Sequence, residues 1–214
     1  MCGWVWQSVT RAELRRLFDA ELPDGFVPKY NLAPTQPLLM VVEQEGRRAV
    51  LARWGFLATA EQPKSLSTFN ARLETARTSP LFREAFQSRQ ALIPIDGLYE
   101  WIGEKGARRP LAMRRRDSLP LVCAGLWNEQ GGVLSCTVLT TAPTGVFAAV
   151  HDRMPLLLPQ DRWAAWLDPA TAVDTVWTLA STPHTLHSAV YTHPVGPAVG
   201  NARNEGIELT LPFS

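Results

Sequence analysis

The sequence predicts a single α+β domain over residues 1–214, with helices flanking a mostly antiparallel mixed sheet or an open barrel. Three observations support this fold class. The chain has 214 residues, of which 46% are hydrophobic, and this is enough for one sizeable core. Short β-type runs bounded by Gly, Pro, Asn or Asp alternate with a few amphipathic helices. No internal repeat or low-complexity linker divides the chain.

The N-terminal part of the chain is expected to hold a helix followed by a hairpin. The helix runs from Thr10 to Ala20, because Thr10 and Glu13 form a capping box ahead of an apolar stripe. Strands are expected over Leu38–Glu43 and Ala49–Phe56, which are rich in aliphatic residues. A charged turn separates these two strands, so a hairpin is the simplest connection.

A second, short helix is expected to begin at Ser79-Pro80 and to run through Phe86, since serine caps helix N-termini and proline suits the first helical turn. Short runs separated by tight turns then predict antiparallel strands over Ala91–Ile95, Leu98–Ile102, Pro110–Arg115, Leu119–Leu126 and Val133–Leu139. Two more helices are expected over Asp161–Leu167 and Ala170–Ala180. The tail from Ser188 onward is expected to be extended or looped.

Composition and charge exclude several classes of protein. The net charge is +1, so any contact with nucleic acid would have to come from a local basic patch. No apolar run approaches the ~20 residues of a membrane span, and the N-terminus lacks the pattern of a secretory signal. Three cysteines cannot all pair, which favours a reducing compartment. We therefore expect a cytoplasmic monomer without a membrane role.

Met1-Cys2-Gly3 carries the most distinctive chemistry of the chain. Removal of Met1 would leave Cys2 with a free α-amine and a free thiol on adjacent carbons. The amine condenses with an aldehyde to a Schiff base, and the tethered thiol then closes a five-membered thiazolidine. An α-amine with a pKa of about 7.7–8.0 keeps a neutral fraction at cytosolic pH. Taken alone, however, a cysteine after the initiator is an accident in most chains.

Three further segments group polar side chains that suit binding or proton transfer. Asn70 lies near a guanidinium and a carboxylate, although a helix cap and a solvated turn would use the same residues. Glu100 lies between two aromatic residues that would desolvate it and raise its pKa, unless strand alternation points it to water. His151 is directly beside a carboxylate and a guanidinium, and its ordinary pKa suits proton transfer near neutrality. An ordinary surface histidine would fit this position as well.

The other histidines give a poor zinc pattern because no cysteine lies near them in the sequence: His184, His187 and His193. Neither a metal nor a cofactor is therefore expected.

Taken in order, these segments resemble the SOS response-associated peptidase family, the abasic-site processing proteins. The resemblance runs through nearly the whole chain. It is carried by short motifs in the family's order: Met1-Cys2-Gly3, Tyr30-Asn31-Leu32-Ala33-Pro34, Arg53-Trp54-Gly55, Asn70-Ala71-Arg72 with Glu74, Asp96-Gly97 leading to Glu100-Trp101, Thr140-Thr141, and His151-Asp152-Arg153-Met154-Pro155. No single motif is specific, but so many in one order are very improbable by chance.

The resemblance implies a covalent trap for abasic sites in single-stranded DNA, active in the response to DNA damage. Cys2 would attack the ring-opened aldehyde of the abasic sugar, and Asn70 would position the amine or the sugar. Glu100 would shuttle protons during Schiff-base formation and ring closure. His151 would protonate the sugar ring oxygen so that the aldehyde opens. The chemistry of each side chain suits its implied task.

The resemblance also implies a groove for single-stranded DNA. Phosphate contacts are expected from three arginines: Arg72, Arg77 and Arg153. The rest of the groove is expected to be lined by rings and small side chains: Asn31, Pro34, Trp54, Trp101 and Thr140. The run Arg114-Arg115-Arg116 precedes Asp117-Ser118 and is instead expected to be the solvated tip of a hairpin.

Two departures from the family's pattern concern this groove. Many members carry Arg directly after Met-Cys-Gly, whereas this chain has Trp4, which removes a possible phosphate contact beside Cys2. The segment after Trp54-Gly55 usually carries a Pro and a further Trp, whereas here it reads Phe56-Leu57-Ala58-Thr59-Ala60. One wall of the groove is therefore not defined by the resemblance.

Two rival functions stay open. The first is a cysteine peptidase with Cys2 as nucleophile and with His151 and Glu100 in support, including one that acts only on its own N-terminus to release Met1. A lyase activity on the DNA is open as well. The second rival is a non-enzymatic module that binds single-stranded DNA, in which Trp4 marks lost chemistry.

Overall fold

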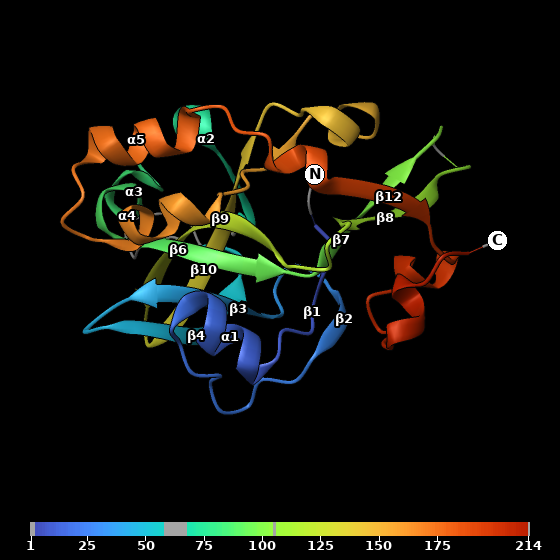
Figure 1. Cartoon of the computed structure of the whole chain (residues 1–214), viewed down its shortest axis with the longest axis horizontal. Coiled ribbons are helices and arrows are strands. Elements are labelled where there is room, and N and C mark those ends of the chain that lie inside the picture. The colour runs from blue at the N-terminus through green and yellow to red at the C-terminus, as the bar shows by residue number, and fades with distance from the viewer. Residues whose placement is uncertain (1–2, 58–67, 105, 214) are drawn as a thin grey trace.

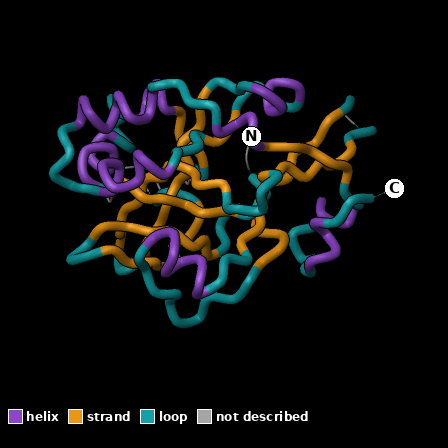
Figure 2. Tube along the Cα trace, viewed as in Figure 1, coloured by secondary structure: helices purple, strands orange, loops and turns teal. Residues whose placement is uncertain are grey.

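The computed structural model describes residues 3–57, 68–104 and 106–213, and these residues confirm the α+β fold (Figure 1). Figure 1 shows two groups of strands, a barrel at the left and a second sheet at the right, with helices outside them. Figure 2 shows the same division, with most helical turns at the periphery and the strands between them. Cys2 and the segment 58–67 lie outside the described residues, and so does most of the segment after Gly55 that departs from the family's pattern.

Five strands close into a barrel: β3 (Pro37–Glu43), β4 (Arg47–Trp54), β6 (Gln90–Ile95), β9 (Leu121–Gln130) and β10 (Val133–Thr141). They follow the order β10-β4-β3-β6-β9, and β9 pairs in turn with β10, so the expected barrel is closed rather than open. Neighbours are antiparallel, except that β4 is parallel to β10. Two short strands extend the sheet along β10: β5 (Asn70–Arg72) and β11 (Met154–Pro155).

The second sheet has the order β12-β8-β7-β1-β2 and is antiparallel throughout. Its strands are β1 (Val5–Gln7), β2 (Lys29–Leu32), β7 (Gly97–Ile102), β8 (Arg109–Arg115) and β12 (Val190–Pro194). The N-terminal strand β1 therefore lies inside the sheet, between β2 and β7. Part of the predicted extended tail forms β12, which covers the edge of β8.

Helix α1 (Arg11–Phe18) has the predicted capping box, in which Thr10 and Glu13 bond each other's backbone amides. The other helices are α2 (Leu73–Ala76), α3 (Arg83–Ser88), α4 (Trp163–Leu167) and α5 (Val173–Ser181). Single turns of 3₁₀ helix connect them: η1 (Gly145–Ala149), η2 (Gln160–Arg162), η3 (Leu186–Ala189), η4 (Pro197–Gly200) and η5 (Ile207–Thr210). None of the helices in the described part of the chain is long and apolar enough to cross a membrane.

Two of the predicted helices begin later than expected. The hydroxyl of Ser79 accepts a bond from the amide of Leu81 and so stabilises a turn, and the helix starts only at Arg83. Asp168 likewise accepts a bond from the amide of Ala170 in a separate turn, ahead of α5. In both places the side chain stabilises a local turn instead of capping the helix, which is a competing structure that Ser and Asp often form.

The predicted hairpin at Arg114-Arg115-Arg116 is wrong, because β8 and β9 belong to different sheets. The run lies where the chain crosses from the second sheet to the barrel. Arg115 makes two hydrogen bonds to the carboxylate of Asp117, at 2.9 and 2.6 Å. Arg116 is exposed, as expected for a solvated turn, and its guanidinium lies over the ring of Tyr191.

Alternation along the barrel strands divides the apolar residues between two cores. Leu38, Met40 and Val42 of β3 belong to a cluster shared by all five barrel strands and by the second sheet. Leu39 and Val41 point the other way, into a cluster with α1, α3, α4 and α5. This is the period of two that a strand imposes when both of its faces are covered.

Gln7 of β1 joins the second sheet to the barrel. Its side-chain nitrogen donates to the carbonyl oxygens of Leu39 and Pro94, at 2.9 and 2.6 Å, and its side-chain oxygen accepts from the amide of Leu39 at 2.8 Å. The side chain is 1% exposed. One buried amide therefore fixes β1 against both β3 and β6.

Replacing Gln7 by leucine should lower the free energy of unfolding by about 2–5 kcal/mol, because each buried backbone group left without its partner costs about 1–3 kcal/mol. Urea unfolding followed by circular dichroism measures this change. Gln44→Leu is the matched control, since Gln44 is exposed at the turn between β3 and β4. Equal unfolding midpoints for the two variants would contradict the assignment of Gln7 as the joint.

Candidate functional site

A cleft of about 610 Å³ opens where the N-terminal segment, the end of β7 and the segment after η1 meet. Glu100 and His151 both line it, together with Trp4, Trp101 and Arg108. The volume falls within the range of about 300–1,000 Å³ that is usual for small-molecule sites. The fold therefore brings together two of the residues that the sequence predicts to be catalytic.

The described chain reaches this cleft at Trp4, two residues after Cys2 in the sequence. Gly3 is buried, and the carbonyl oxygen of Trp4 accepts a bond from the amide of Tyr99 at 2.9 Å. This bond continues the pairing of β1 with β7 up to the edge of the cleft. The backbone two residues after the predicted nucleophile is thus held against β7.

The motif Asp96-Gly97 anchors the other end of β1. The buried carboxylate of Asp96 accepts bonds from the backbone amide and the hydroxyl of Ser8, and burial raises the pKa of this carboxyl above its usual value. Gly97 has no room for a side chain, because the ring of Trp6 fills the space where a Cβ would lie. The motif therefore has a packing role that explains both of its residues.

Glu100 lies on β7 and is 7% exposed. It pairs with Leu111 of β8 and shares its face of the strand with Leu98, which is part of the core. The alternative that strand alternation points Glu100 to water is therefore wrong. A carboxyl group at this depth is shielded from bulk solvent, which suits a proton shuttle.

His151 follows η1, and its backbone amide donates to the carbonyl of Phe147 at 3.0 Å. The amide of Arg153 donates to the ring nitrogen Nδ1 at 3.0 Å, while the carboxylate of Asp152 lies 2.6 Å from the same atom. Only one of these contacts can be a hydrogen bond at a time. In a protonated ring Nδ1–H would donate to Asp152, and in a neutral ring without a proton on Nδ1 that atom would accept from the Arg153 amide. In both cases Nε2 carries a proton.

Asn70 lies on β5, where it pairs with Val138 of β10. It is half-buried and is not among the residues that line the cleft. Its segment is nevertheless tied to that of His151 through the next helix. Glu74 of α2 forms two hydrogen bonds with the guanidinium of Arg153, at 2.8 and 2.7 Å. Asn70 and His151 thus belong to segments that one ion pair holds together.

Arg153 is more constrained than a residue expected to contact phosphate. Besides its bond pair with Glu74, it donates to the carbonyl oxygen of Thr140 at 2.6 Å, and its side chain is 13% exposed. Arg77 is paired with Asp174 of α5. Arg72, at the end of β5, is exposed. Of the three predicted phosphate contacts, Arg72 and Arg77 are exposed, and Arg77 and Arg153 are paired with carboxylates.

Three of the residues expected to line the groove are buried, and this corrects their predicted role. Trp54 is 0% exposed, and its indole nitrogen donates to the carbonyl of Phe69, so its ring cannot stack on a base. Thr140 is 1% exposed and bonds to a backbone carbonyl of β5. Asn31, also 1% exposed, donates to three carbonyls of the C-terminal segment. Pro34 and Trp101 remain half-exposed.

Sequence reasoning missed Trp4 and Arg108 as residues of the cleft. Trp4 was considered only as a lost phosphate contact. The signal that could have found it is its place two residues after Cys2, at the start of a strand. Arg108 is exposed beside the loop that ends β7, and nothing in its local sequence distinguishes it from Arg109.

Cys123 and Cys136 are buried, as expected for core residues, and they form no disulfide. Burial raises the pKa of both thiols to about 12. They therefore stay protonated and are not nucleophiles. Among the residues that the structure describes, no three His, Cys, Asp or Glu side chains come together in a group that could hold a metal ion.

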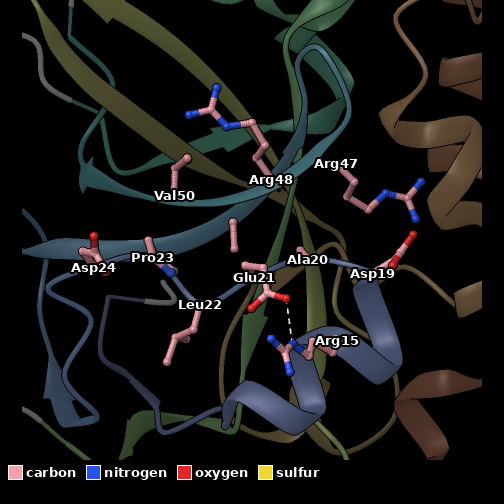
Figure 3. Close-up of a pocket in the computed structure, with 11 residues that line it drawn as sticks. Arg15, Asp19, Ala20, Glu21, Leu22, Pro23, Asp24, Arg47, Arg48 and Val50 are labelled. Atoms are coloured by element: carbon pink, nitrogen blue, oxygen red, sulfur yellow. Dashed lines mark hydrogen bonds and ion pairs between the residues drawn. The ribbon is translucent and has the colours of Figure 1, made fainter.

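A second pocket, of about 640 Å³, lies between α1, the segment that follows it and the start of β4 (Figure 3). Figure 3 shows the ion pair between Arg15 and Glu21 in this pocket, 2.7 Å apart. It holds none of the residues that the sequence predicts to be catalytic. The cleft at Glu100 and His151 is therefore the candidate site.

Comparison with known proteins agrees with this fold. The family model of SOS response associated peptidase (SRAP) matches residues 1–202. The abasic site processing protein YedK of Escherichia coli is 30% identical over 223 residues, covering 99% of this chain and 100% of that protein. The abasic site processing protein YoqW of Bacillus subtilis is 32% identical over 161 residues, covering 71% of this chain and 72% of that protein.

Solved structures show the same fold. A protein from Bacteroides thetaiotaomicron has a TM-score of 0.84 at 16% identity, and the match covers 100% of both chains. A protein from Bordetella bronchiseptica has a TM-score of 0.78 at 24% identity, covering 91% of this chain and 100% of that one.

Replacing Arg153 by glutamine should raise the pKa of Glu74 toward its usual value, because hydrogen bonds from Arg153 are the main cause that keeps this pKa low. A lowered carboxyl pKa stabilises the fold above the unfolded value of about 4.5, and this contribution is lost as pH falls through the folded value. The variant should therefore lose less stability on acidification than the parent chain.

Carboxyl NMR titration of Glu74 and urea unfolding between neutral and acid pH measure the two effects. Arg77→Gln is the control, since it removes an ion pair of the same region but leaves Arg153 in place. A pKa of Glu74 that is the same in Arg153→Gln as in the parent chain would refute the role of this ion pair.

Proposed function

Because the chain belongs to the SOS response associated peptidase (SRAP) family, we propose that it processes abasic sites in DNA and traps them covalently through Cys2. One observation carries the proposal: Glu100 and His151 share a cleft with Trp4, which is two residues after Cys2 in the sequence. The relatives named as abasic site processing proteins give the substrate class. The partner is single-stranded DNA in which one base is missing.

The reaction begins with hydrolysis of the Met1–Cys2 peptide bond, which frees the α-amine of Cys2. The amine nitrogen attacks the aldehyde carbon of the ring-opened sugar, and loss of one water gives the imine. The sulfur of Cys2 then adds to the imine carbon while its proton moves to the nitrogen, and the thiazolidine ring closes. The sequence of steps needs no oxidant or reductant.

His151 serves the opening of the sugar ring. In its protonated form, His151 gives its Nε2 proton to the ring oxygen as the bond from that oxygen to the anomeric carbon breaks, and the anomeric hydroxyl gives its proton back to Nε2 as the aldehyde forms. The carboxylate of Asp152, 2.6 Å from Nδ1, supports this role, since it accepts the Nδ1 proton of the protonated ring.

Glu100 carries protons between the amine, the departing water and the thiol. Its carboxyl group is 7% exposed, so bulk water does not compete for these protons. Asn70 positions the amine or the sugar from β5, whose following helix is fixed to the segment of His151 by Glu74 and Arg153.

Three other functions place different demands on these residues. A cysteine peptidase would need Cys2 as a thiolate nucleophile with His151 beside it, and a lyase would need the imine to lead to strand cleavage. A non-covalent binding module would need neither Glu100 nor His151. Each of these makes a different product from the same mixture of protein and DNA, so one experiment separates them.

Incubation of the chain lacking Met1 with single-stranded DNA that contains an abasic site should give an adduct stable to denaturant. Denaturing gels and intact mass measure it. A peptidase of broad action would instead cleave an unrelated protein, a lyase would release cut DNA, and a binding module would leave both partners intact. Intact DNA without any adduct would refute the trap.

Two variants test the thiazolidine itself. Cys2→Ser keeps the amine and should form only the Schiff base, which borohydride traps but denaturant and water do not preserve. A residue added before Cys2 converts the amine of Cys2 into an amide, so the ring can no longer close and the stable adduct should not form. A stable adduct of Cys2→Ser in undiminished yield would exclude ring closure through the thiol.

Glu100→Gln and His151→Gln should each slow adduct formation by about 10²–10⁴-fold, the usual contribution of one general acid or base. Single-turnover gels give the rates. The controls are Glu104→Gln and His187→Gln, which change the same residue types outside the cleft. Should His151→Gln react as slowly with a ring-opened aldehyde as with the sugar, the assignment of His151 to ring opening would be wrong.

A further inference from the structure

Trp4 and Trp101 form an aromatic corner inside the cleft. Their ring centroids are 5.1 Å apart and their planes meet at 70°. Both side chains are half-buried, and both line the cleft with Glu100 and His151. Two rings in this edge-to-face arrangement leave a face open for a third planar group.

Trp4 differs from three tryptophans of the core in its hydrogen bonding. The indole nitrogens of Trp54, Trp163 and Trp166 each donate to a backbone carbonyl at 2.9 Å. The indole nitrogen of Trp4 is buried and has no acceptor among the described residues. Buried donors are nearly always satisfied in a core, so the place of Trp4 is not explained by internal packing alone.

The corner is supported by a rigid layer. The ring of Tyr99 on β7 packs against that of Trp6, with centroids 4.8 Å apart and planes tilted by 37°, and its hydroxyl donates to the carbonyl of Tyr30 at 2.8 Å. Trp4 and Trp101 pack against the cluster that these residues form. Because β1 and β7 hold both rings, little side-chain entropy is lost when a planar group binds between them.

We propose that this corner binds the nucleobase next to the abasic sugar, by stacking on Trp4 and Trp101. The inference rests on the proposed function and names how the cleft holds its DNA. Where a base is missing, the neighbouring base has lost its stacking partner and exposes one face. The cleft offers that face two rings beside Glu100, and Arg108 is exposed at the same cleft for the adjoining phosphate.

Binding of two oligonucleotides to the unaltered chain tests this directly. Both carry a tetrahydrofuran analogue of the abasic site, which has no aldehyde, so that only non-covalent binding is measured. In one the flanking bases are adenines, and in the other the flanking nucleotides also lack bases. Fluorescence anisotropy should show about 10-fold tighter binding of the adenine-flanked strand, within the range of stacking on one aromatic side chain.

Trp4→Ala and Trp101→Ala should bind the two strands equally, whereas Trp4→Phe should keep most of the preference. Trp177→Phe is the control, because Trp177 is half-buried on α5 and outside the cleft. Equal binding of both strands by the unaltered chain overturns the inference, as does an undiminished preference in Trp4→Ala. If Trp4→Ala does not fold, the two strands on the unaltered chain decide.

The aldehyde assay keeps the two proposals apart. If adducts form at the same rate with and without flanking bases, and do so in both Trp4→Ala and the unaltered chain, base stacking at the corner is refuted. The covalent trap is then still supported. A preference for flanking bases in binding, with no adduct from an aldehyde, refutes the trap and leaves the corner as a base-binding site.

Discussion

The buried amide of Gln7 is the constraint on which the site depends. A three-residue strand at the N-terminus could not hold its place by its own pairing, yet β1 lies inside a sheet and carries the segment that leads into the cleft. Gln7 fixes β1 to Leu39 of β3 and to Pro94 of β6, while Asp96 holds the residue that follows it. Cys2, which starts the proposed chemistry, therefore precedes a strand that is fixed both to the second sheet and to the barrel. Such support is what preorganises a reactive group.

A second tie orders the other side of the site. Glu74 and Arg153 join the segment of Asn70 to that of His151, and the backbone amide of Arg153 lies 3.0 Å from Nδ1 of the imidazole. Both the backbone amide and the guanidinium of Arg153 therefore help to position the site. A guanidinium in a bidentate pair and bonded to Thr140 is a poor candidate for phosphate binding, because DNA would have to compete with Glu74 for it. Positioning explains its contacts better than direct binding does.

Local signals in the sequence predicted local structure well. The capping box of α1 and the hairpin of β3 and β4 were placed correctly because the residues that specify them are close in the chain. The strands β1 and β5 could not be predicted, since each has three residues and is stabilised by partners far along the chain.

The same limit applies to the site. Glu100 and His151 were predicted as a pair by resemblance and do share a cleft, but a motif does not reveal burial. Trp54 and Asn31 therefore looked like groove residues although both are interior.

The physics of Trp4 changes how this chain would hold DNA. An arginine near the N-terminus would bind phosphate, and its contribution would fall with salt as counterions compete. An indole carries no charge, and the base stacking proposed for it depends on the area of the neighbouring base, which is larger for a purine than for a pyrimidine. The net charge of +1 is consistent with a protein whose affinity does not rest mainly on phosphates. If stacking on Trp4 replaces a phosphate contact, recognition would depend less on the DNA backbone, which every strand shares. It would depend more on the base beside the abasic site. An aromatic corner beside the reactive N-terminus would read the context of the lesion as well as the lesion itself.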